Sequence, residues 1–160
     1  MSTAVFPGSF DPVTTGHMDL IRRAAEIFDH LVIGVLVNSA KQPLFTIEER
    51  VDMLRELVAE IPNVTVKSFG GLLADFVEKE KAGAIVRGLR TSVDFEYELP
   101  LAQANYKLYH KADTVFLATA PEYSYISSSA VKELVRYQGD ISRMVPRLVE
   151  QRIQEKLSNH

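Results

Sequence analysis

The feature that most constrains the fold is residues 31–37, Leu-Val-Ile-Gly-Val-Leu-Val, which are apolar at every position. A strand with one wet face alternates apolar and polar side chains. An unbroken apolar run is therefore typical of a strand covered on both faces in a parallel sheet. Short β-branched runs predict four more strands, separated by stretches of helical length. These strands are expected at residues 3–6, 64–68, 84–86 and 114–118, and helices at 16–28, 47–60, 72–81, 93–109, about 128–137 and about 146–157.

This alternation predicts one α/β domain over residues 1–160. Its Rossmann-like parallel five-stranded sheet is flanked by helices on both faces, with further helices near the C-terminus. Local signals set some boundaries. Thr46 and Glu49 have the spacing of a capping box. Gly83 follows the predicted helix 72–81, where a left-handed C-terminal position favours glycine. Pro100 lacks a backbone donor and is expected to kink or delay its helix.

Composition narrows the class of protein. The chain has 160 residues and a formal net charge of -3, so no global positive field exists to hold nucleic acid. It has no cysteine, which excludes disulfides and thiolate catalysis. The longest apolar run is too short to cross a bilayer, and the N-terminal residues do not resemble a signal peptide. We expect a soluble, cytoplasmic protein that binds neither nucleic acid nor membrane and grips any anion with local basic groups.

Residues 6–17, which follow the first predicted strand, have the features of an anion site. Glycines in this segment permit close backbone approach, and the following helix start offers free N–H donors with a partial positive charge. His17 stands at that helix start and can donate a hydrogen bond to the same anion. A histidine that only caps the helix is the alternative. The chain has neither the G-x-G-x-x-G fingerprint nor the G-x-x-x-x-G-K-[ST] loop, which disfavours dinucleotide oxidoreductases and P-loop proteins.

Other polar segments also follow predicted strands, and ligands of such sheets bind beyond the carboxyl ends of the strands. Residues 126–129, Ile-Ser-Ser-Ser, can surround a polyphosphate, although ordinary helix-cap serines are an alternative. Residues 87–90, Arg-Gly-Leu-Arg, can bind phosphates in a bidentate way, and a solvated charge pair is an equal alternative. Lys41 follows the second strand, but an isolated loop lysine is usually only solvated.

Together these segments resemble a known family. T-T-G-H at residues 14–17 is similar to the [HT]-x-G-H signature of the nucleotidyltransferase superfamily. With the neighbouring motifs, nearly the whole chain resembles the bacterial phosphopantetheine adenylyltransferases. R-G-L-R followed closely by D-F-E-Y-E is the most discriminating part. The motifs occur in the order P-G-S-F-D-P at 7–12, T-T-G-H at 14–17, Lys41 with Pro43, R-G-L-R at 87–90, D-F-E-Y-E at 94–98 and I-S-S-S at 126–129.

The resemblance implies that the adenylyl group of ATP is transferred to 4′-phosphopantetheine, which yields dephospho-CoA and pyrophosphate. The acceptor phosphate is itself the nucleophile, so positioning and charge stabilisation would carry the catalysis. The resemblance further implies Mg²⁺ bridging the phosphates and a homohexamer built from two trimers. It leaves open whether coenzyme A inhibits the enzyme by feedback.

The resemblance also assigns roles to residues. His17 would stabilise the pentavalent α-phosphate, and Lys41 and Arg87 would hold the acceptor phosphate. No dedicated metal ligand is expected. Ser9 stands where many relatives have threonine, and it keeps the hydroxyl. The acceptor would contact Ser9, Lys41, Leu73 and Arg87, and ATP would contact Ser9, Phe10, His17, Gly88, Leu89, Arg90, Glu98, Tyr123, Ser124, Tyr125, Ile126, Ser127, Ser128 and Ser129.

Two other functions compete with this interpretation. One is the same chemistry on another acceptor, such as nicotinate mononucleotide or glycerol 3-phosphate. Relatives of that kind usually carry an arginine shortly after the I-S-S segment, where this chain has Ser-Ala-Val-Lys-Glu at residues 129–133. The other is a non-catalytic nucleotide-binding module. Degenerate relatives of that kind typically lose residues such as His17, Lys41, Arg87 and Arg90, all of which are present here.

Overall fold

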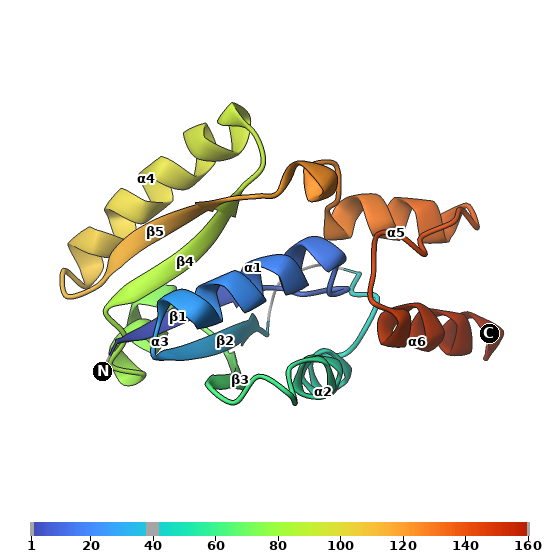
Figure 1. The fold of residues 1–160 in the computed structure, drawn as a ribbon, viewed down its shortest axis with the longest axis horizontal. Helices are drawn as coiled ribbons and strands as arrows, with labels where there is room; N and C mark the ends of the chain where they lie inside the picture. The colour runs from blue at the N-terminus through green and yellow to red at the C-terminus, as the bar shows by residue number, and fades with distance from the viewer. Residues whose placement is uncertain (1, 38–41, 160) are drawn as a thin grey trace.

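The computed structural model describes residues 2–37 and 42–159. Its centre is a parallel five-stranded sheet in the order β3-β2-β1-β4-β5 (Figure 1). This confirms the α/β, Rossmann-like sheet that the alternating sequence pattern predicts. The strands are β1 (Thr3–Gly8), β2 (His30–Leu36), β3 (Val64–Phe69), β4 (Ala84–Leu89) and β5 (Asp113–Ala118).

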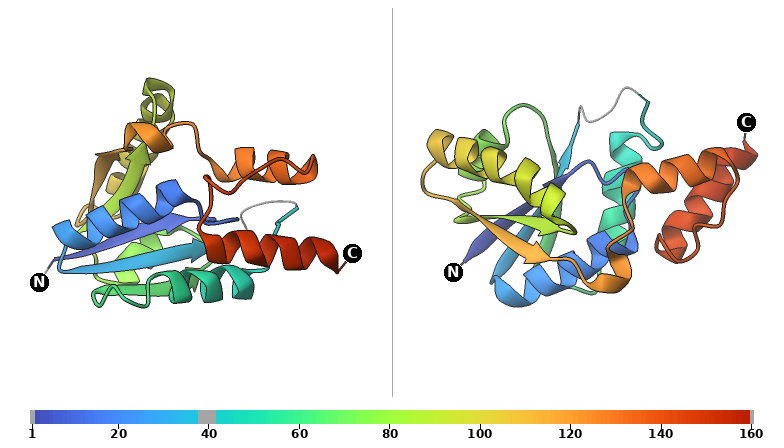
Figure 2. Two further views of the ribbon diagram at one scale, coloured as in Figure 1. Left: turned by 45° about the vertical axis from the view of Figure 1, so that its right-hand side comes forward. Right: turned by 90° about the horizontal axis from the view of Figure 1, so that it is seen from above.

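Helices cover both faces of the sheet, and two more extend beyond it. Buried side chains of the first two helices pack on one face and those of the third on the other, and Phe95 of the fourth helix contacts Phe116 of the sheet. The last two helices lie past the carboxyl ends of the strands, at the right of the view in Figure 1 and again to one side in Figure 2. The elements are α1 (Thr15–Ile27), α2 (Ile47–Leu57), α3 (Leu73–Lys79), α4 (Ser92–Leu108), the 3-10 turn η1 (Pro121–Tyr123), α5 (Ser128–Arg136) and α6 (Arg147–Ser158).

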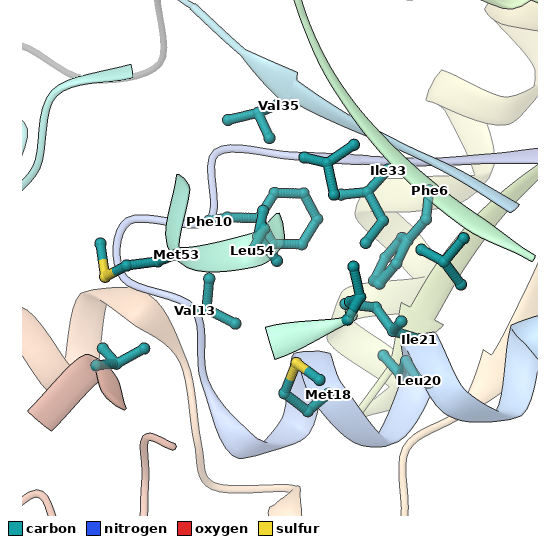
Figure 3. Close-up of a cluster of buried hydrophobic side chains, with 14 of the residues drawn as sticks. Phe6, Phe10, Val13, Met18, Leu20, Ile21, Ile33, Val35, Met53 and Leu54 are labelled. Carbon is teal, nitrogen blue, oxygen red and sulfur yellow. The ribbon is translucent and has the colours of Figure 1, made fainter. Parts of the chain in front are cut away.

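Strand β1 shows how the sheet serves two layers at once. Ala4 and Phe6 belong to the larger buried cluster beneath α1 and α2, whereas Val5 belongs to a smaller cluster that includes side chains of α3. Figure 3 shows the larger cluster, with Phe6 close to side chains of α1. In β2, Val32 and Ile33 divide between the clusters in the same way. Burial on both faces explains why residues 31–37 are apolar without a break.

The strand order reverses at β1, and this fixes where a ligand can bind. The chain builds outward from β1 through β2 to β3, and then crosses to β4 and β5 on the opposite side of β1. The connections that leave β1 and β4 therefore diverge. A crevice between diverging connections at the carboxyl ends of the strands is the usual ligand position in open α/β sheets.

Two predicted helix boundaries have different outcomes. The capping box at α2 is confirmed: the Thr46 amide donates to Oε1 of Glu49 at 3.0 Å, and the Glu49 amide donates to Oγ1 of Thr46 at 3.1 Å. The left-handed position predicted for Gly83 is wrong. Helix α3 ends at Lys79, earlier than expected, so the left-handed residue is Lys81, with φ 56°. The Gly83 amide instead donates to the Thr3 carbonyl as β4 begins.

The end of β4 also differs from the prediction. The strand was expected to stop at residue 86, but it continues to Leu89 because Arg87 and Gly88 pair with Phe116 and Leu117 of β5. Helix α4 runs through Pro100 as one element. No helix in the described part of the chain is both long and apolar enough to span a membrane.

Candidate active site

A cavity of about 310 Å³ opens at the carboxyl ends of β1 and β4, where the strand order reverses. It is lined by the end of β1 with the start of α1, by the end of β4 with α4, and by the segment between β5 and α5. Segments far apart in the sequence thus converge, as the strand-end rule predicts. The predicted site residues that line the cavity are Ser9, Phe10, His17, Arg87, Gly88, Arg90, Glu98, Tyr123, Ile126, Ser127 and Ser128.

Other predicted site residues do not line this cavity. Leu73 packs against the smaller buried cluster of Val5 and its neighbours. Leu89, the last residue of β4, is not part of the lining. Tyr125 is 62% exposed. Ser124 and Ser129 also stand outside the lining. Lys41 lies outside the described residues.

The His17 ring is held by the turn that begins α1. The backbone amide of Thr14 donates to Nδ1 of His17 at 3.0 Å, and the His17 amide donates to Oγ1 of Thr14 at 3.1 Å. This is a capping box in which histidine takes the place usually held by glutamate or glutamine. Because Nδ1 accepts a hydrogen bond, the neutral ring carries its proton on Nε2. His17 therefore presents a hydrogen-bond donor at the cavity wall.

The protonation of His17 follows from its surroundings. Burial, reinforced by the positive charges of Arg87 and Arg90, lowers the pKa of His17 from 6.5 to about 4. The imidazole is consequently neutral at physiological pH. In this state it donates from Nε2 without adding a permanent charge.

The ring of Phe10 packs against the ring of His17. Its side chain is 2% exposed, and its ring meets the His17 ring edge-on with 4.9 Å between centroids. The ring also covers Gly8, where a Cβ atom would come within 3.1 Å of it. Phe10 itself has φ 50°, a left-handed backbone conformation that residues other than glycine rarely adopt. The aromatic ring is therefore committed to the core, and only the backbone of Phe10 is left for a ligand.

Two arginines face the cavity, and each is paired with a carboxylate of α4. Arg87 donates from Nη2 and Nε to the two oxygens of Glu98 at 2.7 and 2.9 Å, and from Nη1 to the Pro7 carbonyl at 3.0 Å. Arg90 donates from Nε to Asp94 at 3.1 Å. Burial raises the pKa of the Asp94 carboxyl, but hydrogen bonds from Arg90 and its charge outweigh that effect and lower the pKa overall. The cavity thus holds two ion pairs rather than two lone cations.

Gly88 lets α1 approach β4 closely. A Cβ atom at this position would collide with Cδ1 of Leu20 in α1, and it would lie 3.6 Å from Oγ1 of Thr119. Leu20 is buried and itself lines the cavity. The absence of a side chain at residue 88 therefore sets the spacing between the helix that carries His17 and the strand that carries Arg87.

The serine segment serves the fold as well as the cavity. Oγ of Ser127 accepts from the Ala130 amide at 3.0 Å and so caps α5, as the alternative interpretation of this segment holds. Ser128 donates from Oγ to the Pro12 carbonyl at 2.8 Å. Both serines still line the cavity. An anion bound here would meet the N–H groups at the start of α5 in addition to the hydroxyls.

Several residues that line this cavity were given no role by sequence reasoning, and three of them show what a sequence can and cannot signal. Thr14 orients His17, and its spacing to a histidine three residues later could have indicated a capping box. Asp94 pairs with Arg90, and its position four residues later in the chain was an available signal. Thr119 lines the cavity just after β5, and no pattern in the sequence distinguishes it.

Comparison with known proteins places the chain in a family. The cytidylyltransferase-like family model matches residues 5–134. The chain is 57% identical to a phosphopantetheine adenylyltransferase of Lachnoclostridium phytofermentans, over 98% of this chain and 96% of the relative. It is 50% identical to one of Caldanaerobacter subterraneus subsp. tengcongensis, over 98% of both chains. Among solved structures, a putative nicotinate-nucleotide adenylyltransferase of Vibrio parahaemolyticus shares the fold, with a TM-score of 0.71, 15% identity and coverage of 96% and 99%. The cavity of histidine, arginines and serines at the strand ends agrees with these matches. Because the identity is 50–57% over nearly the full length of both chains, this chain belongs to the phosphopantetheine adenylyltransferases, within the cytidylyltransferase-like family.

Proposed function

We propose that this protein transfers the adenylyl group of ATP to 4′-phosphopantetheine. A phosphate oxygen of the acceptor attacks the α-phosphorus of ATP. The bond between that phosphorus and the oxygen that bridges to the β-phosphate breaks as the new bond forms. The products are dephospho-CoA and pyrophosphate. The observation that carries this proposal is that the chain is 50–57% identical, over nearly its full length, to relatives named phosphopantetheine adenylyltransferase.

The cavity has the chemistry that such a transfer needs. The nucleophile is already an anion at neutral pH, so no enzyme base has to remove a proton. Charge gathers on the non-bridging oxygens of the α-phosphorus in the transition state, and a fixed donor aimed there lowers the barrier. His17 is such a donor, because Thr14 holds its ring and leaves Nε2 protonated.

We assign the acceptor phosphate to Arg87, together with Lys41. Arg87 is anchored by Glu98 and by the Pro7 carbonyl, which use three of its five N–H groups. Two donors remain for a phosphate. Ser9 precedes the buried Phe10 and lines the cavity, and we assign its hydroxyl to both substrates. Leu73 remains a proposed contact of the pantetheine arm, at a position outside the cavity.

ATP is assigned to the remaining walls of the cavity. The start of α5 supplies N–H donors for the phosphates, and Arg90 lies close to that segment because its Nη1 donates to the Ile126 carbonyl at 3.2 Å. Phe10 contributes through its backbone. The other proposed nucleotide contacts are Ser9, His17, Gly88, Leu89, Glu98 and residues 123–129.

We propose that Mg²⁺ accompanies ATP. In residues 2–37 and 42–159, no three His, Asp or Glu side chains gather to hold a metal. The cavity carboxylates Asp94 and Glu98 are already paired with arginines. This donor set fits an ion held mainly by phosphate oxygens and water, which Mg²⁺ tolerates well. When bound, the ion would offset charge on the triphosphate.

We further propose a homohexamer, a cytoplasmic location and sensitivity to coenzyme A at the acceptor site. Support for assembly comes from α4, whose outer surface carries exposed apolar side chains that a subunit contact would cover. They are Val93, Phe95, Tyr97, Leu101, Tyr106 and Leu108. Light scattering coupled to size exclusion tests the assembly, and competition of coenzyme A with the acceptor tests the inhibition.

Pyrophosphate release with separate acceptors tests the main proposal. The purified protein is incubated with ATP, Mg²⁺ and one of 4′-phosphopantetheine, nicotinate mononucleotide or glycerol 3-phosphate. We expect release only with 4′-phosphopantetheine, accompanied by dephospho-CoA. Release with another acceptor would transfer the His17 mechanism to that substrate. Measurable ATP binding without release in any reaction would indicate a non-catalytic nucleotide-binding module. Calorimetry of ATP with and without Mg²⁺ tests the metal separately.

A further inference from the structure

The carboxylate of Asp11 joins three segments of the chain, and none of the roles proposed above uses it, although Asp11 belongs to the P-G-S-F-D-P motif. The residue is 1% exposed and lies in the loop between β1 and α1. Its Oδ2 and Oδ1 accept from the backbone amides of Leu44 and Phe45, both at 2.9 Å, in the connection that leads to α2. Its Oδ2 also pairs with Nζ of Lys132, in α5, at 3.0 Å.

Neither member of this pair lines the cavity, but the segments that they join do. The loop of Asp11 carries Ser9 and leads to His17. Helix α5, which carries Lys132, begins with Ser128 at the cavity wall. The pair thus spans the two walls that would face each other across a bound triphosphate.

Two further hydrogen bonds restrain the backbone of the loop between β1 and α1. Arg50 of α2 donates from Nη1 to the Ser9 carbonyl at 2.8 Å, and Ser128 of α5 donates to the Pro12 carbonyl. These contacts hold the backbone on either side of Asp11. The ion pair with Lys132 is the charged contact between this loop and α5, and its carboxylate is buried. A buried carboxylate that lost this partner would keep, among residues 2–37 and 42–159, its two backbone donors and would favour a shift of the loop.

We propose that Asp11 and Lys132 are positioning residues for nucleotide binding and transfer. They act through the β1–α1 loop and the start of α5, and they set the spacing between His17 and the serine segment. This inference rests on the proposed function for its catalytic part. Its nucleotide-binding part can be measured without any acceptor.

The test compares Lys132→Met with a matched control, Lys67→Met. Lys67 also pairs with a largely buried carboxylate, that of Glu80, at 2.8 Å. The control pair joins β3 to the residue that follows α3, and neither of its members lines the cavity. Each variant is measured for ATP affinity by calorimetry with Mg²⁺, for kcat and KM, and for thermal midpoint. Lys132→Arg, which keeps the charge, is the conservative variant.

We expect Lys132→Met to weaken ATP binding and lower kcat, with a loss in kcat/KM approaching about 100-fold, the scale of a misplaced reactive group. Lys132→Arg should recover most of that loss. Lys67→Met should leave ATP affinity and kcat unchanged, because neither member of its ion pair lines the cavity. Wild-type ATP affinity and kcat in a Lys132→Met protein whose thermal midpoint alone has fallen would overturn the proposal.

Two further measurements keep the outcome clear. Should Lys132→Met not fold, the double variant Asp11→Asn/Lys132→Met takes its place, because it removes the ion pair without leaving a buried unpaired carboxylate. A folded double variant with wild-type ATP affinity and kcat would also overturn the proposal. Should the wild-type protein bind ATP without transferring its adenylyl group to 4′-phosphopantetheine, the proposed function fails. The ATP affinities of the variants still decide the role of Asp11 and Lys132.

Discussion

Arg87 and Glu98 face each other across the site in a two-point ion pair, with both oxygens of the carboxylate engaged by Nε and Nη2 of the arginine. The glutamate is 8% exposed, whereas the arginine side chain is 31% exposed and keeps access to the cavity. This geometry fixes the guanidinium plane before a ligand arrives. A phosphate that binds Arg87 therefore meets a donor whose orientation is already set.

Removing the charge of Arg87 should separate acceptor binding from stability. We expect Arg87→Gln to weaken 4′-phosphopantetheine binding about 10- to 100-fold, the scale of a lost hydrogen bond to a charged group. ATP binding should change less. The buried Glu98 loses its partner, so the free energy of unfolding should fall by about 1–3 kcal/mol. The double variant Arg87→Gln/Glu98→Gln should recover stability but not acceptor affinity. Calorimetry and urea denaturation measure the two effects, and a larger loss for ATP than for the acceptor would contradict the assignment.

Loss of the His17 donor should affect turnover more than binding. We expect His17→Ala to lower kcat by on the order of 100- to 1,000-fold, as for removal of one transition-state donor. Both substrates should still bind. His30→Ala is the control, because His30 begins β2 and does not line the cavity, and its Nε2 lies 3.2 Å from the hydroxyl of Thr65 in β3. Substrate affinities that fell in step with kcat would show that His17 acts in ground-state binding.

The low pKa of His17 should make stability depend on pH. The folded protein holds the neutral ring down to pH about 4, whereas the unfolded chain takes up a proton below 6.5. Between these values the unfolded state binds more protons, so its stability relative to the folded state rises as the pH falls. The contribution of His17 is fully present above pH 6.5 and is lost as the pH drops toward 4, by no more than about 3 kcal/mol. Urea denaturation from pH 7 to 4 should show a steeper loss for wild type than for His17→Gln, and parallel curves would exclude this linkage.

A methyl group at residue 88 should disturb the spacing between α1 and β4. We expect Gly88→Ala to destabilise the protein by about 1–3 kcal/mol through overpacking against Leu20, and to lower kcat. Leu20→Val in the same chain should relieve part of both effects, because its side chain is shorter. Gly83→Ala is the matched control, since a Cβ atom there meets open space. Equal stability of Gly88→Ala and Gly83→Ala would show that the close approach does not matter.

The sheet could be predicted because its strands are buried on both faces, and burial of that kind leaves apolar runs that the sequence displays directly. The prediction failed where burial stops. Arg87 and Gly88 belong to β4 because they pair with β5, but both line the cavity, and neither is a large apolar residue. They therefore break the apolar pattern. The misplaced left-handed residue has a similar cause. Lys81 takes the left-handed conformation because α3 ends early. Residue preferences alone point instead to the nearby Gly83, since glycine adopts that conformation most readily.

The candidate site was predictable as a set of segments and not as a set of contacts. The strand-end rule and the family motifs brought His17, Arg87 and Ser128 together correctly. Pairs such as Arg87 with Glu98 depend on how α4 crosses the sheet, and a linear pattern does not contain that angle. Asp11 with Lys132 was equally hidden, because the two residues come from opposite ends of the chain.

The paired arginines have a consequence for how a ligand reaches this protein. Arg87 and Arg90 are each balanced by a carboxylate, and the whole chain carries a net charge of -3. Such a surface casts no attractive field over several ångströms of solvent, so a polyphosphate is not drawn in from a distance. Recognition takes place at contact, through donors whose directions are fixed. Because the net charges of chain and polyphosphate have the same sign, the association rate should not fall as ionic strength rises. Selectivity for one anion over another then depends on shape and hydrogen-bond geometry rather than on charge alone.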